Sequence, residues 1–203
     1  VEQEPNYTYV TARILLDNIR TESLTYLGMQ KQATQTEMQE LYPQAFRNFL
    51  AKGVENEILN PELLEMDIEK LGQAIDPSRD NLFTYLGLQT LYDRYFIHDT
   101  ETRYELPQVF FMRVSMGLAL REENREERAI EFYNLLSSFD YMSSTPTLFN
   151  SGTKHSQLSS CYLTTVPDDL HGIYGAIQDN AMLSKWAGGL GNDWTPVRGL
   201  GSQ

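Results

Sequence analysis

The sequence predicts a mainly α-helical domain followed by a strand-helix-strand unit, the opening part of a parallel α/β layer. Apolar residues recur at helical spacing through the first two thirds of the chain, in segments separated by prolines and glycines. After about Tyr141 the composition changes to a long stretch rich in Ser, Thr, Pro and Gly. Short β-branched and glycine-bounded runs then flank one more helical pattern. We therefore place a helical domain at residues 1–142 and the α/β unit at residues 143–203.

Three signals define the first helices. Residues 7–20 carry apolar side chains at helical spacing, so one stripe of this segment should face a core. Asn60 followed by Pro61 is typical of an N-cap with proline at the first helical position, and the apolar period continues to Leu71. We expect one helix over that segment and expect Gly53 to close the helix before it.

The remaining elements of the helical domain follow in order. From Asp80 onward a broad apolar pattern indicates a deeply packed helix; its marker residues are Leu82, Leu86, Tyr92 and Tyr95. The segment 96–107 alternates like a short hairpin or an extended loop, and Pro107 begins the next helix. The charge run at 121–128 is typical of a solvated turn and helix start, and a last helix includes Ala129.

The α/β unit begins after a long polar loop at 141–157. The run "CYLTTV" at 161–166 predicts a strand, and "PDD" predicts a turn with an acidic N-cap. The helix that follows should bury a stripe consisting of Leu170, Ile173, Ile177, Ala181 and Trp186. The segment 188–201 then closes the helix and restarts an extended strand.

Composition limits the function. The 203 residues are 41% hydrophobic, which is ample for a real core. Acidic residues outnumber basic ones by 28 to 16, and the net charge of −12 disfavours nucleic-acid binding because an acidic surface repels a phosphate polymer. One cysteine cannot form an internal disulfide, and no apolar run approaches the ~20 residues that span a bilayer. Since the N-terminus does not look like a signal peptide, we expect a cytoplasmic protein without membrane attachment.

Taken singly, the chemically suggestive residues favour structural roles. A lone Cys161 is more often a buried, inert thiol, and Asp168 and Asp169 are most simply helix caps. Thr147 and Ser160 can act as turn hydroxyls. The "GGLG" run fits a helix end, with phosphate binding as the alternative, and the three histidines lack metal-ligand spacing, so no metal site is expected.

In combination the motifs resemble a known family. "STPTLFNSG", then "QLSSCYL", then "DDLHGIYGAIQDNAMLSKWAGGLGNDWTPVRGLGS" resemble the large catalytic subunit of ribonucleotide reductase in its bacterial class I form. "EPNYTYVTARILLDNI" and "SRDNLFTYLGLQTLYDRYFI" resemble the same family, so the likeness covers essentially the whole chain. It implies that residues 143–203 begin a ten-stranded α/β barrel. It also implies thiyl-radical reduction of ribonucleoside diphosphates to deoxyribonucleoside diphosphates.

The resemblance assigns roles to individual positions. Cys161 would be catalytic, as one member of a redox cysteine pair whose second member lies outside this sequence. The positions that match substrate-binding residues are Thr147, Ser160, Cys161 and Gly189. The positions that match the allosteric effector site are Asp168, Asp169, Leu170 and Arg198.

The resemblance also implies partners. A radical-generating, metal-containing small (beta) subunit would supply the radical, thioredoxin or glutaredoxin the electrons, and nucleoside triphosphates the regulation. No cofactor would be bound directly by this chain. Large subunits would form a homodimer through the helix at about 169–187. Because the family's ATP cone and downstream catalytic residues are missing here, we expect this chain alone to be inactive.

Two alternatives remain open at this stage. One is a portion of a cobalamin-dependent class II reductase, which the sequence downstream of Gln203 would distinguish. The other is a noncatalytic helical interaction module in which Cys161 is merely buried, which a nucleotide-binding assay on the complete chain would distinguish.

Overall fold

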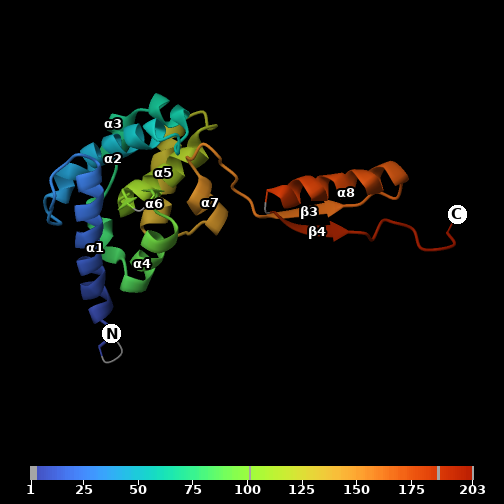
Figure 1. Ribbon diagram of the computed structural model, residues 1–203, viewed down its shortest axis with the longest axis horizontal. Coiled ribbons are helices and arrows are strands. Elements are labelled where there is room, and N and C mark those ends of the chain that lie inside the picture. The colour runs from blue at the N-terminus through green and yellow to red at the C-terminus, as the bar shows by residue number, and fades with distance from the viewer. Residues whose placement is uncertain (1–3, 101, 187, 203) are drawn as a thin grey trace. The chain divides into compact units, whose positions relative to one another are not determined.

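The computed structural model describes residues 4–100, 102–186 and 188–202 and contains two compact units, Val1–Ser156 and Gln157–Gln203 (Figure 1). The first unit is helical and the second is a parallel strand-helix-strand unit, which confirms the predicted fold class. The division falls after the segment 143–156, which the sequence pattern groups with the α/β unit. In the described part of the chain, no helix is both apolar enough and long enough to span a bilayer.

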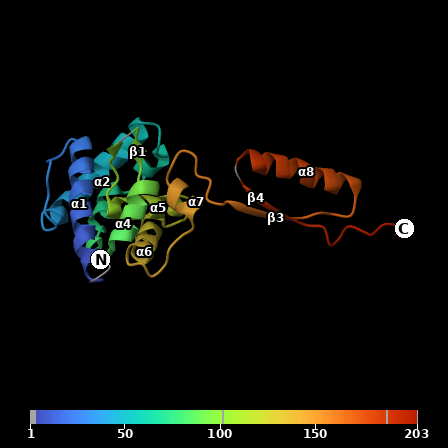
Figure 2. The same cartoon turned by 60° about the horizontal axis from the view of Figure 1, so that its bottom comes forward.

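The helical unit is built around a central helix, α5. The elements of this unit are α1 (Tyr7–Tyr26), α2 (Met38–Glu55), the 3₁₀ helix η1 (Pro61–Glu65), α3 (Ile68–Gln73), the 3₁₀ helix η2 (Pro77–Leu82), α4 (Tyr85–Arg94), the antiparallel strands β1 (His98–Asp99) and β2 (Thr102–Arg103), α5 (Pro107–Ala119), α6 (Arg125–Ser137) and α7 (Thr145–Asn150). Eleven of the thirteen α5 residues are buried. A helix that is buried on all sides must lie in the middle of its domain, and both views show α5 among the other helices (Figure 2).

The predicted hairpin at 96–107 and the helix start at Pro107 are confirmed. The single helix expected at 60–71 is instead two short helices. The Asn60 side chain caps η1 as predicted, because its Oδ1 accepts from the Glu62 N–H (3.0 Å). Asp67 then caps a second start, accepting from the Lys70 N–H (2.9 Å), and this competing cap divides the apolar period into η1 and α3.

Gly53 does not close α2, contrary to the prediction. The helix continues to Glu55, and the residue with positive φ that follows it is Glu57 (φ 59°). Gly53 is needed for packing, since a Cβ at this position would overlap the side chain of Leu59. A glycine in a helical pattern can therefore mark a close contact and not an end.

The helix after Asp80 is not deeply packed on the side that the sequence indicated. Leu82 is exposed, and Leu86 has 73% of its surface exposed. The α-helix begins only at Tyr85, after the cap residue Thr84, so that Leu88 and Leu91 face the core and Leu86 points away.

The second unit consists of two parallel strands and one helix. Strand β3 (Cys161–Thr165) pairs with β4 (Gly189–Asp193), and α8 (Leu170–Lys185) connects them, lying along the pair in both views (Figures 1 and 2). The predicted stripe of α8 is mostly wrong, because Ile173 is half-buried but the other four residues are exposed: Leu170, Ile177, Ala181 and Trp186. Apart from two glycines, the positions that are buried or half-buried are Ile173, Ala176, Asn180 and Leu183. They follow one another at three- and four-residue steps, which define one helix face.

The second unit buries few apolar side chains. Among its described residues, Val166 and Ala176 are the buried hydrophobic ones, whereas Leu163 in the middle of β3 is 88% exposed. A two-stranded sheet leaves strand edges open, and exposed apolar groups on its face favour association with further structure. The unit therefore has the properties of a part of a larger sheet.

Candidate functional site

The first residues of β3 and β4 lie side by side. Cys161 is the register partner of Gly189, and the Gly189 N–H donates to the Ser160 carbonyl (2.6 Å). A Cβ at Gly189 would stand 3.1 Å from the Ser160 carbonyl oxygen and 4.0 Å from Cys161 Sγ. Because glycine lacks this atom, β4 approaches β3 closely and the space beside the sulfur stays open. Three of the four predicted substrate residues are therefore neighbours.

The Cys161 thiol is exposed, so the interpretation of an isolated cysteine as a buried one is wrong for this unit. Exposure alternates along β3: Tyr162 and Thr164 are half-buried, whereas Cys161, Leu163 and Thr165 are exposed. Successive side chains of a strand point to opposite faces, which puts Cys161 on the face that α8 leaves uncovered. On that face the thiol is accessible to a substrate or to a second thiol.

A second glycine, Gly188, packs against Tyr162, the residue after Cys161. A Cβ at Gly188 would stand 2.8 Å from the ring of Tyr162, whose hydroxyl donates to the Ser159 carbonyl (3.0 Å). The ring therefore packs over the glycine backbone on the α8 side of the sheet. The "GGLG" run serves close packing of backbone and side chain, at the end of α8 and the start of β4.

Beyond the other end of β3, Asp168 binds Arg198 through two hydrogen bonds. Oδ1 accepts from the Arg198 backbone N–H (3.1 Å), and Oδ2 accepts from Nε (2.7 Å). These bonds, first the backbone N–H and then the side chain, hold the pKa of Asp168 below its usual value. The pair fixes the tail of the unit to the turn before α8.

The remaining two predicted effector residues begin α8. Asp169 is the N-cap and accepts from the Gly172 N–H (2.8 Å), as predicted, and Leu170 is the exposed first residue of the helix. The five residues of β3 span roughly 16 Å at about 3.3 Å per residue. Cys161 and the Asp168–Arg198 pair therefore occupy opposite ends of one strand.

Thr147 belongs to the helical unit and not to the strand-helix-strand unit. It is half-buried in α7, and its carbonyl accepts from the Ser151 N–H (3.0 Å). The sequence indicated a loop over 141–157, but the central part of this segment is a helix of six residues, Thr145–Asn150.

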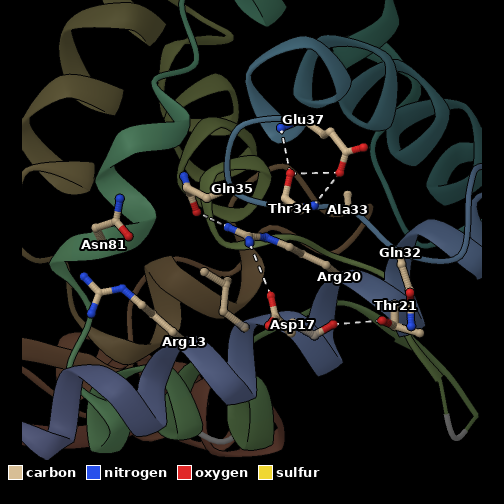
Figure 3. Close-up of a pocket in the computed structure, with 11 residues that line it drawn as sticks. Arg13, Asp17, Arg20, Thr21, Gln32, Ala33, Thr34, Gln35, Glu37 and Asn81 are labelled. Atoms are coloured by element: carbon tan, nitrogen blue, oxygen red, sulfur yellow. Dashed lines mark hydrogen bonds and ion pairs between the residues drawn. The ribbon is translucent and has the colours of Figure 1, made fainter.

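A cavity of about 700 Å³ in the helical unit contains none of the predicted site residues (Figure 3). It lies between α1 and the segment 32–37, and Arg20 is the buried cation in its wall. The Arg20 guanidinium bonds Gln35 and Asp80 and lies 3.6 Å from Asp17, so it links three parts of the unit.

Among the residues with described positions, no group of three or more His, Cys, Asp or Glu side chains is arranged to hold a metal ion.

One buried side chain beside α7 carries no motif in the sequence. Arg113 lies in α5 with no exposed surface and binds Glu105 and two main-chain carbonyls at the end of α7. The sequence signal for it is a single cation inside the mainly apolar run "PQVFFMRVSMGLAL".

Comparisons with known proteins agree with this arrangement. Residues 81–156 match the family described as "Ribonucleotide reductase, all-alpha domain", and residues 159–203 match "Ribonucleotide reductase, barrel domain". The chain is 52% identical over its full length to the ribonucleoside-diphosphate reductase subunit alpha of Chlamydia muridarum, of which it covers 19%. It is 38% identical over 98% of its length to the Helicobacter pylori subunit alpha, covering 24%, and 33% identical over 98% to the Caenorhabditis elegans large subunit, covering 24%. The chain thus spans about a fifth to a quarter of the length of these relatives.

Proposed function

The chain belongs to the ribonucleotide reductase large-subunit family, and we propose that within the complete subunit it serves the reduction of ribonucleoside diphosphates to deoxyribonucleoside diphosphates. The observation that carries this proposal is the exposed Cys161 thiol, which lies beside Gly189 on the uncovered face of a parallel strand pair. An accessible thiol on a sheet that needs further strands is what a redox residue of a barrel enzyme requires. It also disfavours the noncatalytic module, in which Cys161 would be buried.

In the proposed reaction Cys161 is one of two thiols that supply electrons. The 2′-hydroxyl of the ribose leaves as water, and the two electrons that replace the C–O bond come from the thiol pair, which ends as a disulfide. The second thiol and the residue that carries the thiyl radical belong to sequence outside this chain. A metal-containing small subunit supplies the radical, and thioredoxin or glutaredoxin returns the disulfide to thiols.

We propose substrate contacts for Thr147, in the helical unit, and for Ser160, Cys161 and Gly189, in the strand-helix-strand unit. The hydroxyls of Thr147 and Ser160 are suited to oxygens of a diphosphate, and Gly189 leaves room for the ligand beside the sulfur. We expect each of these residues to contact the substrate in the complete subunit.

The reaction is tested with the complete large subunit, the small subunit and a dithiol reductant, using cytidine diphosphate and a triphosphate effector. We expect deoxycytidine diphosphate to form only when both subunits are present. No product under these conditions contradicts the proposed reaction. Turnover that needs cobalamin and no small subunit would instead place the protein in class II.

We further propose that the Asp168–Arg198 pair, with Asp169 and Leu170, binds a deoxynucleoside triphosphate effector. Among the described residues, the Arg198 guanidinium binds Asp168 through Nε, so its other N–H groups can point at triphosphate oxygens. The carboxylate orients the guanidinium for this contact. Because the pKa of Asp168 is lowered, the pair should persist at neutral and mildly acidic pH and weaken only as the pH falls through the lowered pKa.

Arg198→Ala is expected to weaken effector binding by about tenfold or more, since a charge-assisted contact to phosphate is lost. Arg198→Lys should recover only part of the affinity, because an ammonium cannot bind Asp168 and phosphate as a fork. Effector affinity of the complete subunit is measured by equilibrium dialysis, with the KM for diphosphate in the absence of effector as the control. Unchanged effector affinity in Arg198→Ala contradicts the assignment.

A further inference from the structure

We propose that Arg113 is a positioning residue for the substrate site, which fixes α7 and therefore Thr147. This inference rests on the proposed function, in which Thr147 contacts the substrate. Arg113 itself touches no substrate, because it is completely buried in the helical unit.

The guanidinium of Arg113, in α5, binds the carboxylate of Glu105 and the main chain at the end of α7. On one side Nε and Nη2 donate to the two carboxylate oxygens of Glu105 (2.6 and 3.2 Å). On the other side Nη1 donates to the Ser151 carbonyl (2.6 Å) and Nη2 to the Leu148 carbonyl (3.3 Å). The planar fork makes these directions rigid, so the carboxylate sets the guanidinium and the guanidinium sets the backbone.

The backbone that Arg113 holds is adjacent to Thr147. Leu148 directly follows it in the chain, and the N–H of Ser151 donates to the Thr147 carbonyl (3.0 Å). An α-helix of six residues is too short to be stable alone, so its position depends on tertiary contacts. The last carbonyl groups of a helix have no partner within the helix. Here the carbonyls of Leu148 and Ser151, at the C-terminal end of α7 and just beyond it, accept hydrogen bonds from Arg113.

Close backbone packing makes the contact between α5 and the end of α7 intolerant of movement. A Cβ at Gly117 would overlap the Gly152 nitrogen, and Gly152 itself has a positive φ of 77°. The Ser151 hydroxyl also donates to the Val114 carbonyl (2.6 Å). With the backbones this close, a shift of the guanidinium is transmitted to α7 and not absorbed by a gap.

Stability alone does not explain a buried ion pair at this place. Moving both charges out of water costs much free energy. A protein with well-packed apolar residues in place of a buried ion pair is therefore often equally or more stable. What an apolar pair cannot do is donate two directed hydrogen bonds to main-chain carbonyls. The geometry therefore points to placement of α7 as the role of Arg113.

The test uses the complete subunit, assayed with the small subunit. Arg113→Met should raise the KM for the diphosphate by roughly tenfold or more, because misplacement of a binding group by about 1 Å is enough to cost up to about 10²-fold. Effector affinity should be unchanged. Arg113→Lys should not restore the KM, since an ammonium cannot reach both the carboxylate and the two carbonyls.

Two controls separate placement from stability. Arg20→Met removes another buried guanidinium of the same unit, bonded to Asp80, and should lower stability without raising the KM. The double variant Glu105→Gln/Arg113→Met removes both charges and keeps an acceptor for the Ile97 N–H, so it should recover stability but keep the raised KM. If the single variant does not fold, the double variant carries the test.

A normal KM in folded Arg113→Met or in the double variant overturns the positioning role. The same holds if Arg20→Met raises the KM equally. The variant Thr147→Val shows whether only the positioning role of Arg113 fails or whether the proposed substrate contact of Thr147 fails as well. If Thr147→Val raises the KM and Arg113→Met does not, only the inference fails. If Thr147→Val has no effect, the proposed substrate contact fails and the inference falls with it.

Discussion

Replacing Cys161 by serine in the complete subunit is expected to abolish multiple-turnover reduction while leaving the fold and nucleotide binding intact. The thiol is exposed and lies 3.9 Å from the Ser160 hydroxyl, so exchange of sulfur for oxygen disturbs no core contact. A serine cannot form a disulfide, and the pair can then supply no electrons. Turnover is measured with a dithiol reductant, and folding by thermal unfolding.

Ser159→Ala is the matched control for this experiment. Ser159 lies two residues before Cys161, and it is its main-chain carbonyl that accepts from the Tyr162 hydroxyl (3.0 Å), a bond that alanine preserves. Loss of turnover in Cys161→Ser with normal turnover in Ser159→Ala supports a redox role. Cys161→Ser that turns over at the normal rate with the reductant rules that role out.

Local chemistry explains which parts of the fold were predictable. Asn60 and Asp169 cap helices and Pro107 begins one, as expected, because each effect depends on atoms within three residues along the chain. The hairpin at 96–107 follows from alternation over a few residues. Each of these elements is determined by residues of its own segment, so the sequence of that segment is enough to predict it.

The sequence-based predictions fail where contacts with a distant segment determine the local structure. The sequence cannot show that Gly53 meets Leu59 or that a cap at Asp67 competes with the longer helix. Residues 143–156 looked like a loop of the α/β unit because their composition is polar. They fold as part of the helical unit because Arg113 and Gly117, far away in the sequence, hold them there.

The candidate site was predictable only in part, for a similar reason. Cys161 alone favours a buried thiol, and only the order of the motifs around it indicated a redox role. The structure adds the register with Gly189 and the uncovered sheet face, neither of which can be read from residue types. It also pairs Asp168 with Arg198, separated by a helix and a strand, whereas the sequence placed both at an effector site without relating one to the other.

The surface of α8 gives a second prediction with a large effect. Tyr174 is 64% exposed and Met182 55% exposed, and neither belongs to the sheet-facing line of the helix. Large apolar side chains of this kind are enriched in interface cores. We propose that a second large subunit covers them, as the family resemblance implies, so that Tyr174→Asp and Met182→Lys should each weaken homodimerisation by about tenfold or more. Ser184→Lys is the control and should leave the dimer intact, because Ser184 is an exposed polar position of α8 that is neither three nor four residues from Tyr174 or Met182.

The same substitutions should also lower effector affinity. Asp169 caps α8, and Asp168 in the preceding position holds Arg198, so the proposed effector site is attached directly to the N-terminus of the proposed interface helix. If the effector binds the dimer more tightly than the monomer, linkage requires that dimerisation and effector binding strengthen each other by the same factor. Sedimentation of the complete subunit with and without deoxynucleoside triphosphate measures one side of this coupling, and equilibrium dialysis measures the other. Weakened dimers with unaltered effector affinity would mean that α8 assembles the enzyme without carrying the allosteric signal, and an unaltered dimer would remove α8 from the interface altogether.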